Sequence, residues 1–197
     1  MSRRIRNSTK YLFDRVLSFA GLILLLPVLA VIALVILWRD GRPVFFIQPR
    51  VGRNGRLFRM VKFRTMRRND GANTVSVLGD SRITPTGAWL RRHKLDELPE
   101  LWNVLAGQMS LVGPRPDVPG YADRLAGDDR LILQLRPGIT GPATLKYTRE
   151  EELLAGVEDP VRYNNEVIWP DKVRINLAYY HHHNLFTDLK IIIKTFV

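Results

Sequence analysis

The sequence predicts a mixed α/β, helix-rich fold in which an apolar N-terminal helix precedes one small domain with a β-hairpin and amphipathic helices. Three features predict this fold. They are a long uncharged run near the N-terminus, a turn signal between two strand-like segments, and helical spacing of apolar residues from residue 87 onward. We expect residues 1–40 to form a basic segment and a membrane helix, and residues 41–197 to form the domain.

The apolar run extends from Val16 to Trp38 and carries no charge. Because a helix crosses a bilayer core with about 20 residues, a simple span is one interpretation. Pro27 favours another, since a proline inside a helix removes a hydrogen bond and bends or breaks it. Basic residues flank the run on both sides, so the preference of positive charge for the cytoplasmic side distinguishes neither end. A bend at Pro27 gives two arms of about 16 Å that enter and leave one leaflet, and the residues alone leave both interpretations open.

A β-hairpin is predicted next. Residues Val44–Gln48 and Leu57–Met66 have the composition of strands, and Asn54-Gly55 between them tolerates the positive φ angles of a tight turn. The polar segment Arg67–Ser76 predicts a loop.

Helical spacing returns over residues 87–107, where one face carries Leu95, Leu98, Leu101, Trp102 and Leu105. A loop rich in proline and glycine follows over Ser110–Gly120, and REEELLAG predicts a later short helix.

The C-terminal segment is amphipathic, with an apolar face of Leu185, Leu189, Ile192 and Phe196. Its Lys190 and Lys194 suit a helix on a membrane surface. A helix packed on the domain core is the equal alternative.

Composition limits the partners. The 197 residues carry a formal net charge of +11, which favours anionic partners such as a membrane surface, a nucleic acid or a phosphorylated small molecule. The absence of cysteine excludes disulfides and thiolate metal sites. No Walker, GxGxxG, GxSxG or HExxH motif occurs. The consecutive residues His181–His183 point in different directions on a helix, which disfavours a metal site.

The acidic pair Asp96-Glu97 lies between the basic stretch RRHK and Pro99. Proline favours the first turn of a helix, and the positive end of a helix keeps carboxylates ionised and attracts phosphates. An ionised carboxylate can attack phosphorus or bind Mg²⁺. An isolated acidic pair is more often an exposed helix cap, so these residues need further support.

Four cations are candidate phosphate ligands. Lys62 and Arg64 lie two apart on a predicted strand and therefore share a face, where they grip a diphosphate or simply face solvent. Arg115 is held between two prolines, and its planar guanidinium suits phosphate binding. Arg82 joins the site or forms a local ion pair with Asp80, and we favour the ion pair.

Several segments together resemble one family, the small monotopic phosphoglycosyl transferases among the bacterial sugar transferases. The resemblance extends from about Tyr11 to the C-terminus and is carried by RVGRNGRLFRMVKFRTM, DSRITPTGAWLRRHKLDELPELWNVLAGQMSLVGPRP, LRPGITG and TDLKIIIKT. It implies an enzyme that transfers a sugar phosphate from a nucleotide sugar, usually a UDP-sugar, to a polyprenol phosphate, typically undecaprenyl phosphate, with release of UMP. Such a step initiates the synthesis of a surface polysaccharide, for example an exopolysaccharide, or of a glycoconjugate.

The resemblance also implies roles for individual residues. Asp96 would be the nucleophile of a covalent phosphosugar intermediate and would contact Mg²⁺, and Glu97 would assist it. Lys62, Arg64 and Arg115 match positions suited to the diphosphate. Pro27 matches the break of a re-entrant membrane helix, which implies a bacterial inner-membrane protein with its catalytic domain on the cytoplasmic face. The oligomeric state stays open, a homodimer included.

This sequence departs from the family pattern at Lys94, at Gln108 and in PATLKYTREEELL after the RPGITG segment. The last departure leaves the donor sugar open between a plain hexose and an N-acetylated or modified amino sugar. A non-catalytic alternative is a basic membrane-anchored binder of anionic lipid or nucleic acid. That alternative predicts that Asp96 and Glu97 are dispensable, and the lack of a recognised nucleic-acid module disfavours it.

Overall fold

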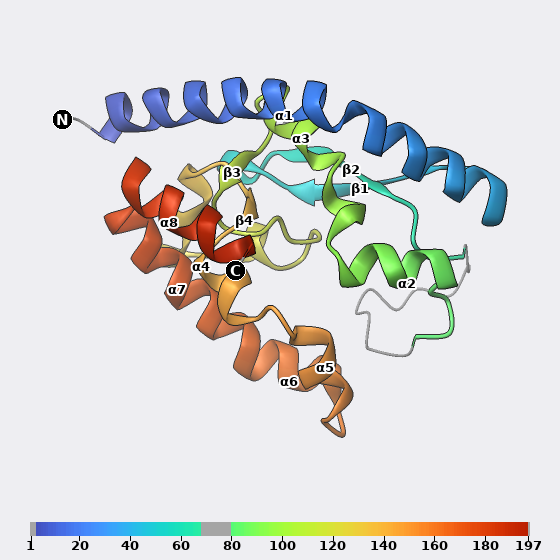
Figure 1. Ribbon diagram of the computed structural model, residues 1–197. Helices are drawn as coiled ribbons and strands as arrows, with labels where there is room; N and C mark the ends of the chain where they lie inside the picture. The colour runs from blue at the N-terminus through green and yellow to red at the C-terminus, as the bar shows by residue number, and fades with distance from the viewer. Residues whose placement is uncertain (1–2, 68–79, 197) are drawn as a thin grey trace.

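The computed structural model describes residues 3–67 and 80–196 of the chain. A single long helix, α1, runs along one face of all the other elements, and its direction changes along its course (Figure 1). It comprises the 37 residues Arg3–Arg39 and includes Pro27, the usual cause of a bend in a helix. In order, the remaining elements are β1 (Phe45–Val51), η1 (Arg53–Gly55), β2 (Leu57–Phe63), α2 (Pro85–Arg92), η2 (Leu95–Glu97), α3 (Glu100–Leu105), β3 (Ser110–Val112), η3 (Ala122–Arg124), η4 (Gly127–Gln134), β4 (Gly138–Thr140), α4 (Pro142–Lys146), α5 (Glu150–Ala155), α6 (Pro160–Tyr163), η5 (Asn164–Ile168), α7 (Trp169–His182) and α8 (Leu185–Phe196). The prediction of a mixed α/β, helix-rich fold is confirmed.

Both halves of α1 contact the rest of the chain. In the N-terminal half, Lys10 Nζ lies 2.7 Å from Asp188 Oδ2, and Ser110 Oγ donates to Asp14 Oδ2 at 2.5 Å. In the C-terminal half, Ile32 and Ile36 pack with apolar residues of β2 and α2. Because the two ends are joined to the same body, the helix does not project away from it.

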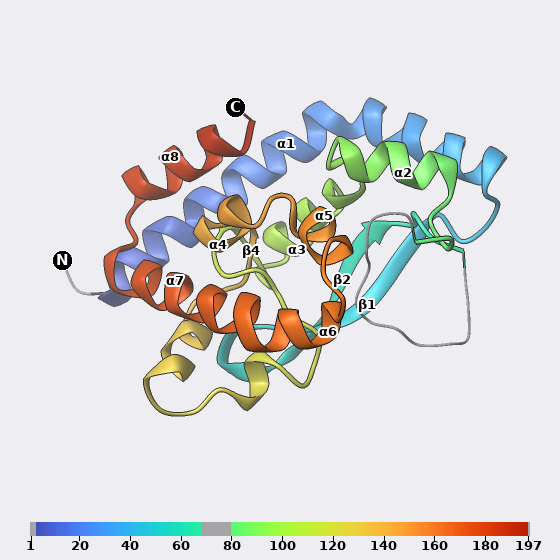
Figure 2. The same cartoon turned by 90° about the horizontal axis from the view of Figure 1, so that it is seen from below.

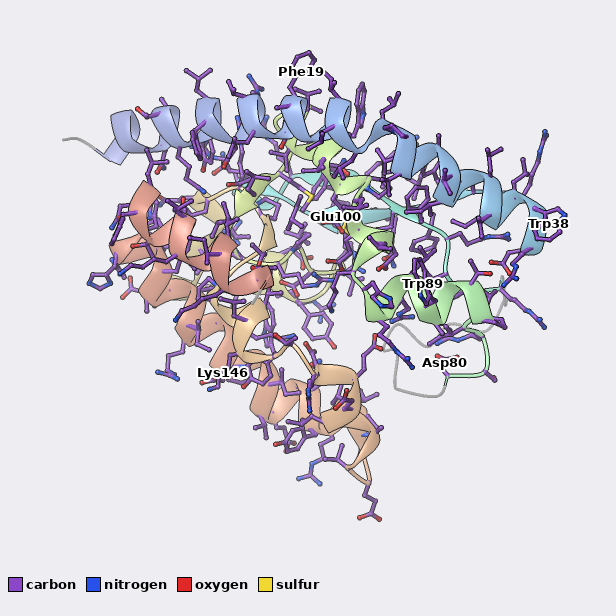
Figure 3. The ribbon with its side chains drawn as sticks, in the orientation of Figure 1. Phe19, Trp38, Asp80, Trp89, Glu100 and Lys146 are labelled. Carbon is purple, nitrogen blue, oxygen red and sulfur yellow. The ribbon has the colours of Figure 1, made fainter. Side chains whose placement is uncertain are left out.

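The opposite side of α1 is apolar and exposed. Phe19 and Trp38 point away from the domain (Figure 3), and this surface also includes Leu12, Val16, Ile23, Leu24, Leu26, Val31, Leu34 and Leu37. Within the described residues, α1 is the one helix long and apolar enough to cross a membrane. These side chains are excluded from water only if another apolar phase covers them.

The predicted hairpin is confirmed. Strands β1 and β2 pair antiparallel from Phe45 opposite Phe63 to Val51 opposite Leu57. The turn contains Asn54 at φ 59° and Gly55 at φ 75°, the positive angles for which these residue types were predicted. The second strand ends at Phe63, short of the predicted Met66, which instead makes an isolated bridge to Ile83. Most of the loop predicted over Arg67–Ser76 lies outside the described residues.

The helical region predicted over residues 87–107 is interrupted, which corrects the prediction of a shared apolar face. Helix α2 ends at Arg92, Lys94 adopts a left-handed φ of 55°, and α3 begins at Glu100. Proline at position 99 fits the start of a helix and not its interior. Leu95 and Leu98 therefore pack toward α1, whereas Trp102 on α3 is 60% exposed.

A parallel pair of strands, β3 and β4, was not predicted. Ser110 pairs with Gly138 and Val112 with Thr140, although the connecting segment contains only short 3₁₀ turns. The pairing requires two glycines in contact, because a Cβ on Gly138 would lie 2.1 Å from the backbone nitrogen of Gly113.

The short helix predicted at REEELLAG is confirmed as α5. Helix α8 runs beside the N-terminal half of α1 (Figure 2), in agreement with the contact between Lys10 and Asp188. One side of α8 buries Asp188 and Ile191, whereas Leu185, Phe186, Leu189 and Ile193 are exposed. The predicted face is therefore divided: Leu185 and Leu189 face outward, and Ile192 packs against the core.

Candidate active site

The acidic pair lies in η2, the corner between α2 and α3. Asp96 is only 8% exposed, and no hydrogen bond or ion pair connects its carboxyl to a described residue. Burial raises the pKa of Asp96 and the neighbouring charge of Glu97 raises it further, while the positive charges of Lys62, Arg91 and Arg115 oppose the rise. The corner thus presents an unpaired carboxyl group close to cations.

Glu97 has the opposite environment. Lys62 Nζ donates to Glu97 Oε1 at 2.7 Å, and both terminal nitrogens of Arg115 donate to the Glu97 carboxylate. Burial alone would raise the pKa of Glu97, but Arg115 and Lys62 hold it well below its usual range. Glu97 therefore stays ionised, and it orients the two cations beside Asp96.

Three predicted site residues thus come together from separate segments. Lys62 lies on β2, Glu97 in η2 and Arg115 in the loop after β3. Asn103 fixes the first of these contacts, because its side chain accepts from Val61 N at 3.0 Å and donates to Arg59 O at 2.7 Å, which joins α3 to the strand that carries Lys62. The loop between two prolines that carries Arg115 positions the second contact, that between Arg115 and Glu97.

A fourth residue, Glu100, was not predicted. It is 1% exposed and lies in the interior of the molecule (Figure 3). Lys62 Nζ lies 3.2 Å from Glu100 Oε1, but that oxygen has no hydrogen bond within the described residues. Burial is the main reason that the pKa of Glu100 rises to about 7, and the charge of Glu97 adds to it. Its position three residues after Glu97 places it near that residue, but no sequence signal indicates that it is buried beside Lys62.

Two predicted phosphate ligands have other partners. Arg64 donates to the carbonyl oxygens of Asp40 and Gly41 at 2.6 and 2.7 Å, in the turn that follows α1. Arg82 forms the favoured ion pair with Asp80, at 2.5 Å from Nη2 to Oδ2, and lowers the pKa of Asp80 to about 2.

Among the described residues, the site offers few ligands for a divalent cation. No group of three or more potential ligands occurs among the described residues, and His183 is buried with its ring nitrogens near Tyr180 O and Asn7 Oδ1. Mg²⁺, however, commonly uses one or two carboxylates together with substrate phosphates. The unpaired Asp96 carboxyl fits that requirement, so a phosphate-bearing substrate would complete the ligand set.

The chain is similar to known proteins along nearly its whole length. A family model described as bacterial sugar transferase matches residues 5–197. An undecaprenyl-phosphate glucose phosphotransferase of Komagataeibacter xylinus is 38% identical over 94% of this chain and 35% of its own length. A UDP-galactose-lipid carrier transferase of Erwinia amylovora is 34% identical over 96% of this chain and 40% of its own length.

The chain spans well under half the length of those two relatives. It covers more of a shorter one: the exopolysaccharide production protein ExoY of Rhizobium meliloti is 32% identical over 98% of this chain and 86% of its own length. Since the family model extends over nearly every residue, from the N-terminal helix through the acidic corner to α8, the chain belongs to the bacterial sugar transferase family.

Proposed function

We propose that this protein transfers a sugar-1-phosphate from a UDP-sugar to a polyprenol phosphate, undecaprenyl phosphate in the first instance, and releases UMP. The observation that carries the proposal is the acidic corner: an unpaired buried Asp96 lies next to Glu97, which is held by Lys62 and Arg115. Relatives named for undecaprenyl phosphate and for exopolysaccharide production support the substrate class and a role early in polysaccharide synthesis.

The reaction is proposed in two displacements. A carboxylate oxygen of Asp96 attacks the phosphorus that bears the sugar, the bond from that phosphorus to the bridging oxygen breaks, and UMP leaves with the electron pair. A phosphate oxygen of the polyprenol phosphate then attacks the same phosphorus, and the Asp96 carboxylate leaves. Two steps at one carboxylate allow a soluble donor and a lipid acceptor to use the site in turn.

The cations supply charge stabilisation, which dominates phosphoryl transfer. Lys62 and Arg115 are held beside Asp96 by Glu97, so they can bind the diphosphate without further ordering. Mg²⁺, bound by Asp96 and the donor phosphates, would supply additional neutralisation of the diphosphate charge. It would also favour the ionised form of Asp96 against the effect of burial.

We further propose that α1 is re-entrant, with both ends on the cytoplasmic side of the inner membrane. The support is that Lys10 and Asp14 near one end, and Ile32 and Ile36 near the other, all contact the same domain. A straight crossing would require one of these sets of contacts to be released. The exposed apolar side of α1, and Leu185 and Phe186 of α8, would then face lipid.

Membrane topology can be tested by cysteine labelling, because the chain has no native cysteine. Ser2→Cys and Asp128→Cys would each be exposed to an impermeant thiol reagent on intact spheroplasts. The re-entrant arrangement predicts that both sites are labelled only after lysis. Labelling of Ser2→Cys alone in intact spheroplasts would instead establish a crossing helix.

The reaction is tested by UMP release in detergent or nanodiscs, with undecaprenyl phosphate, Mg²⁺ and a panel of UDP-sugars. The relatives differ in the sugar they are named for, glucose or galactose, so both are included with N-acetylated donors. Asp96→Asn should abolish lipid-dependent release while the unfolding midpoint is preserved, and the exposed Asp129→Asn should leave release unchanged. Turnover by Asp96→Asn would exclude the covalent mechanism, and salt-sensitive lipid binding without turnover would favour the non-catalytic alternative.

A further inference from the structure

The loop that brings Arg115 to Glu97 carries a second acidic residue, Asp117. Its backbone is fixed on both flanks: Gly138 N donates to Pro114 O at 2.8 Å, and Val51 N donates to Asp117 O at 2.9 Å. Arg50 also donates to Pro116 O at 3.2 Å. Because the loop is held by strands β1 and β4, Arg115 and Asp117 keep a constant relative position.

Asp117 and Arg115 line the same small pocket, together with Gly52 at the end of β1 and Leu133 of η4. No described residue donates a hydrogen bond to the Asp117 carboxyl, and burial raises its pKa to about 7. Asp117 is only partly buried, so its carboxyl can be reached from the pocket. A carboxyl that has no donor on the chain and faces a pocket is open to a donor on a ligand.

Three cations near Asp117 are each occupied by another acceptor. Lys172 donates to both oxygens of Glu150 at 2.7 and 2.6 Å, Arg50 donates to Gln48, and Arg115 donates to Glu97. They attract the Asp117 carboxylate at a distance, but none forms a hydrogen bond with it. Its oxygens remain available as acceptors for a ligand.

We propose that Asp117 is a donor-recognition residue that accepts hydrogen bonds from hydroxyl groups of the bound sugar nucleotide. The inference rests on the proposed function, in which Arg115 holds the diphosphate. The hexose is attached to one end of that diphosphate and the ribose to the other, so hydroxyl groups of both lie close to Arg115 and to the pocket it shares with Asp117. A carboxylate is an acceptor of hydroxyl hydrogen bonds and donates none when ionised.

This arrangement affects specificity. A site built to bind a hydroxyl group discriminates against an analogue that lacks it, because the acceptor, covered by the bound donor, is then left without a partner. The hydroxyl that meets Asp117 should therefore be the position at which the enzyme is least tolerant of deoxy donors.

The experiment compares wild type, Asp117→Ala and Asp117→Asn, with the exposed Asp129→Asn as the matched control. Each is assayed for kcat/KM with a UDP-hexose, with its singly deoxygenated analogues, and with the analogue lacking the ribose 2′-hydroxyl. We expect one deoxy donor to be about 10- to 100-fold poorer with wild type, the range of a hydrogen bond to a charged group. With Asp117→Ala, that donor and its parent should become equivalent. The position of the deoxy group identifies whether hexose or ribose is recognised.

If Asp117 had a purely structural role, its substitution would lower kcat/KM for all donors by the same factor. The ratios of kcat/KM between donors would then stay at the wild-type values, which would overturn the proposal. Failure of the proposed function is distinguished by measuring donor binding to Asp96→Asn and to Asp96→Asn/Asp117→Ala. If donors bind but no UMP is released by wild type, the reaction is wrong, and loss of deoxy discrimination in binding still supports Asp117. Unchanged discrimination in the double variant, or no binding of any donor, overturns the inference.

Discussion

Lys62 lies between two glutamates, with its Nζ 2.7 Å from Glu97 Oε1 and 3.2 Å from Glu100 Oε1. Arg115 also pairs with Glu97, so Glu97 has two cationic partners and Glu100 shares only one of them. The pKa of Glu97 is correspondingly lowered, whereas that of Glu100 rises to about 7. The balance of charge in the site thus depends on Lys62.

Lys62→Met should damage both stability and activity. It leaves Glu97 and Glu100 buried without their shared cation, and removal of one partner from a buried pair costs about 3 kcal/mol. Glu97 keeps Arg115 as a partner, so Lys62→Met/Glu100→Gln removes the charge left without a cation and should recover part of that stability, measured by urea unfolding. UMP release should stay at least about 100-fold below wild type in both variants, since the charge proposed to bind the donor phosphates is still missing. Recovery of turnover in the double variant would assign Lys62 a structural role.

Glu100→Gln should stabilise the protein more at pH 8 than at pH 5.5. Since the folded pKa of about 7 exceeds the ordinary 4.5, the native state binds the extra proton and stability falls as pH rises through this interval. The difference between these two pKa values corresponds to about 3 kcal/mol of unfolding free energy. Wild type loses this stability fully above pH 7 and keeps it below pH 4.5. Glutamine mimics the protonated form at every pH. Urea unfolding at both pH values tests this, with the exposed Glu158→Gln as the control, and an equal effect at both pH values would contradict it.

The sequence was sufficient to predict the parts that depend on local signals. Asn54-Gly55 predicted the hairpin because its φ requirements are local, and the acidic pair with Lys62 and Arg115 was identified through spaced motifs. The hydrogen-bond partners of Arg64 and Arg82 depend on which acceptor lies nearest in space. A carbonyl of Asp40 and the carboxylate of Asp80 are those acceptors, and for Arg64 that partner could not be read from strand alternation.

Other features required the tertiary structure. Glu100 reads as an ordinary helix-surface acid, and only the packing of α3 against β2 buries it beside Lys62. The left-handed Lys94 splits a region whose apolar spacing is continuous, since periodicity does not register a single φ angle. Strands β3 and β4 are three residues each, too short for an alternating pattern, and depend on contact between Gly113 and Gly138.

Asp188→Ala should release the N-terminal half of α1 from the domain. Asp188 accepts from Lys10 at 2.7 Å and from Tyr179 at 2.5 Å, and its loss leaves Lys10 buried with Asp14 3.6 Å away. We expect a loss of about 2–4 kcal/mol and faster amide hydrogen exchange over residues 7–18. Lys194→Ala, an exposed position on the same helix, is the control. Exchange unchanged from wild type would show that the remaining contacts, among them that between Ser110 and Asp14, suffice to hold this half of the helix.

Gly138→Ala tests whether the β3–β4 contact positions the loop that carries Arg115. The new Cβ would lie 2.1 Å from Gly113 N and 2.5 Å from Thr140 O, and backbone atoms cannot move aside as a flexible side chain can. We expect a loss of at least about 3 kcal/mol, and any folded fraction should show a raised KM for the donor because the Arg115 loop begins next to this contact. Gly156→Ala is the matched control, since its Cβ would meet nothing closer than 3.6 Å and its effect should stay within about 1 kcal/mol. If Gly138→Ala proves as stable and active as Gly156→Ala, the loop must be held by its other contacts, those of Arg50 and Val51.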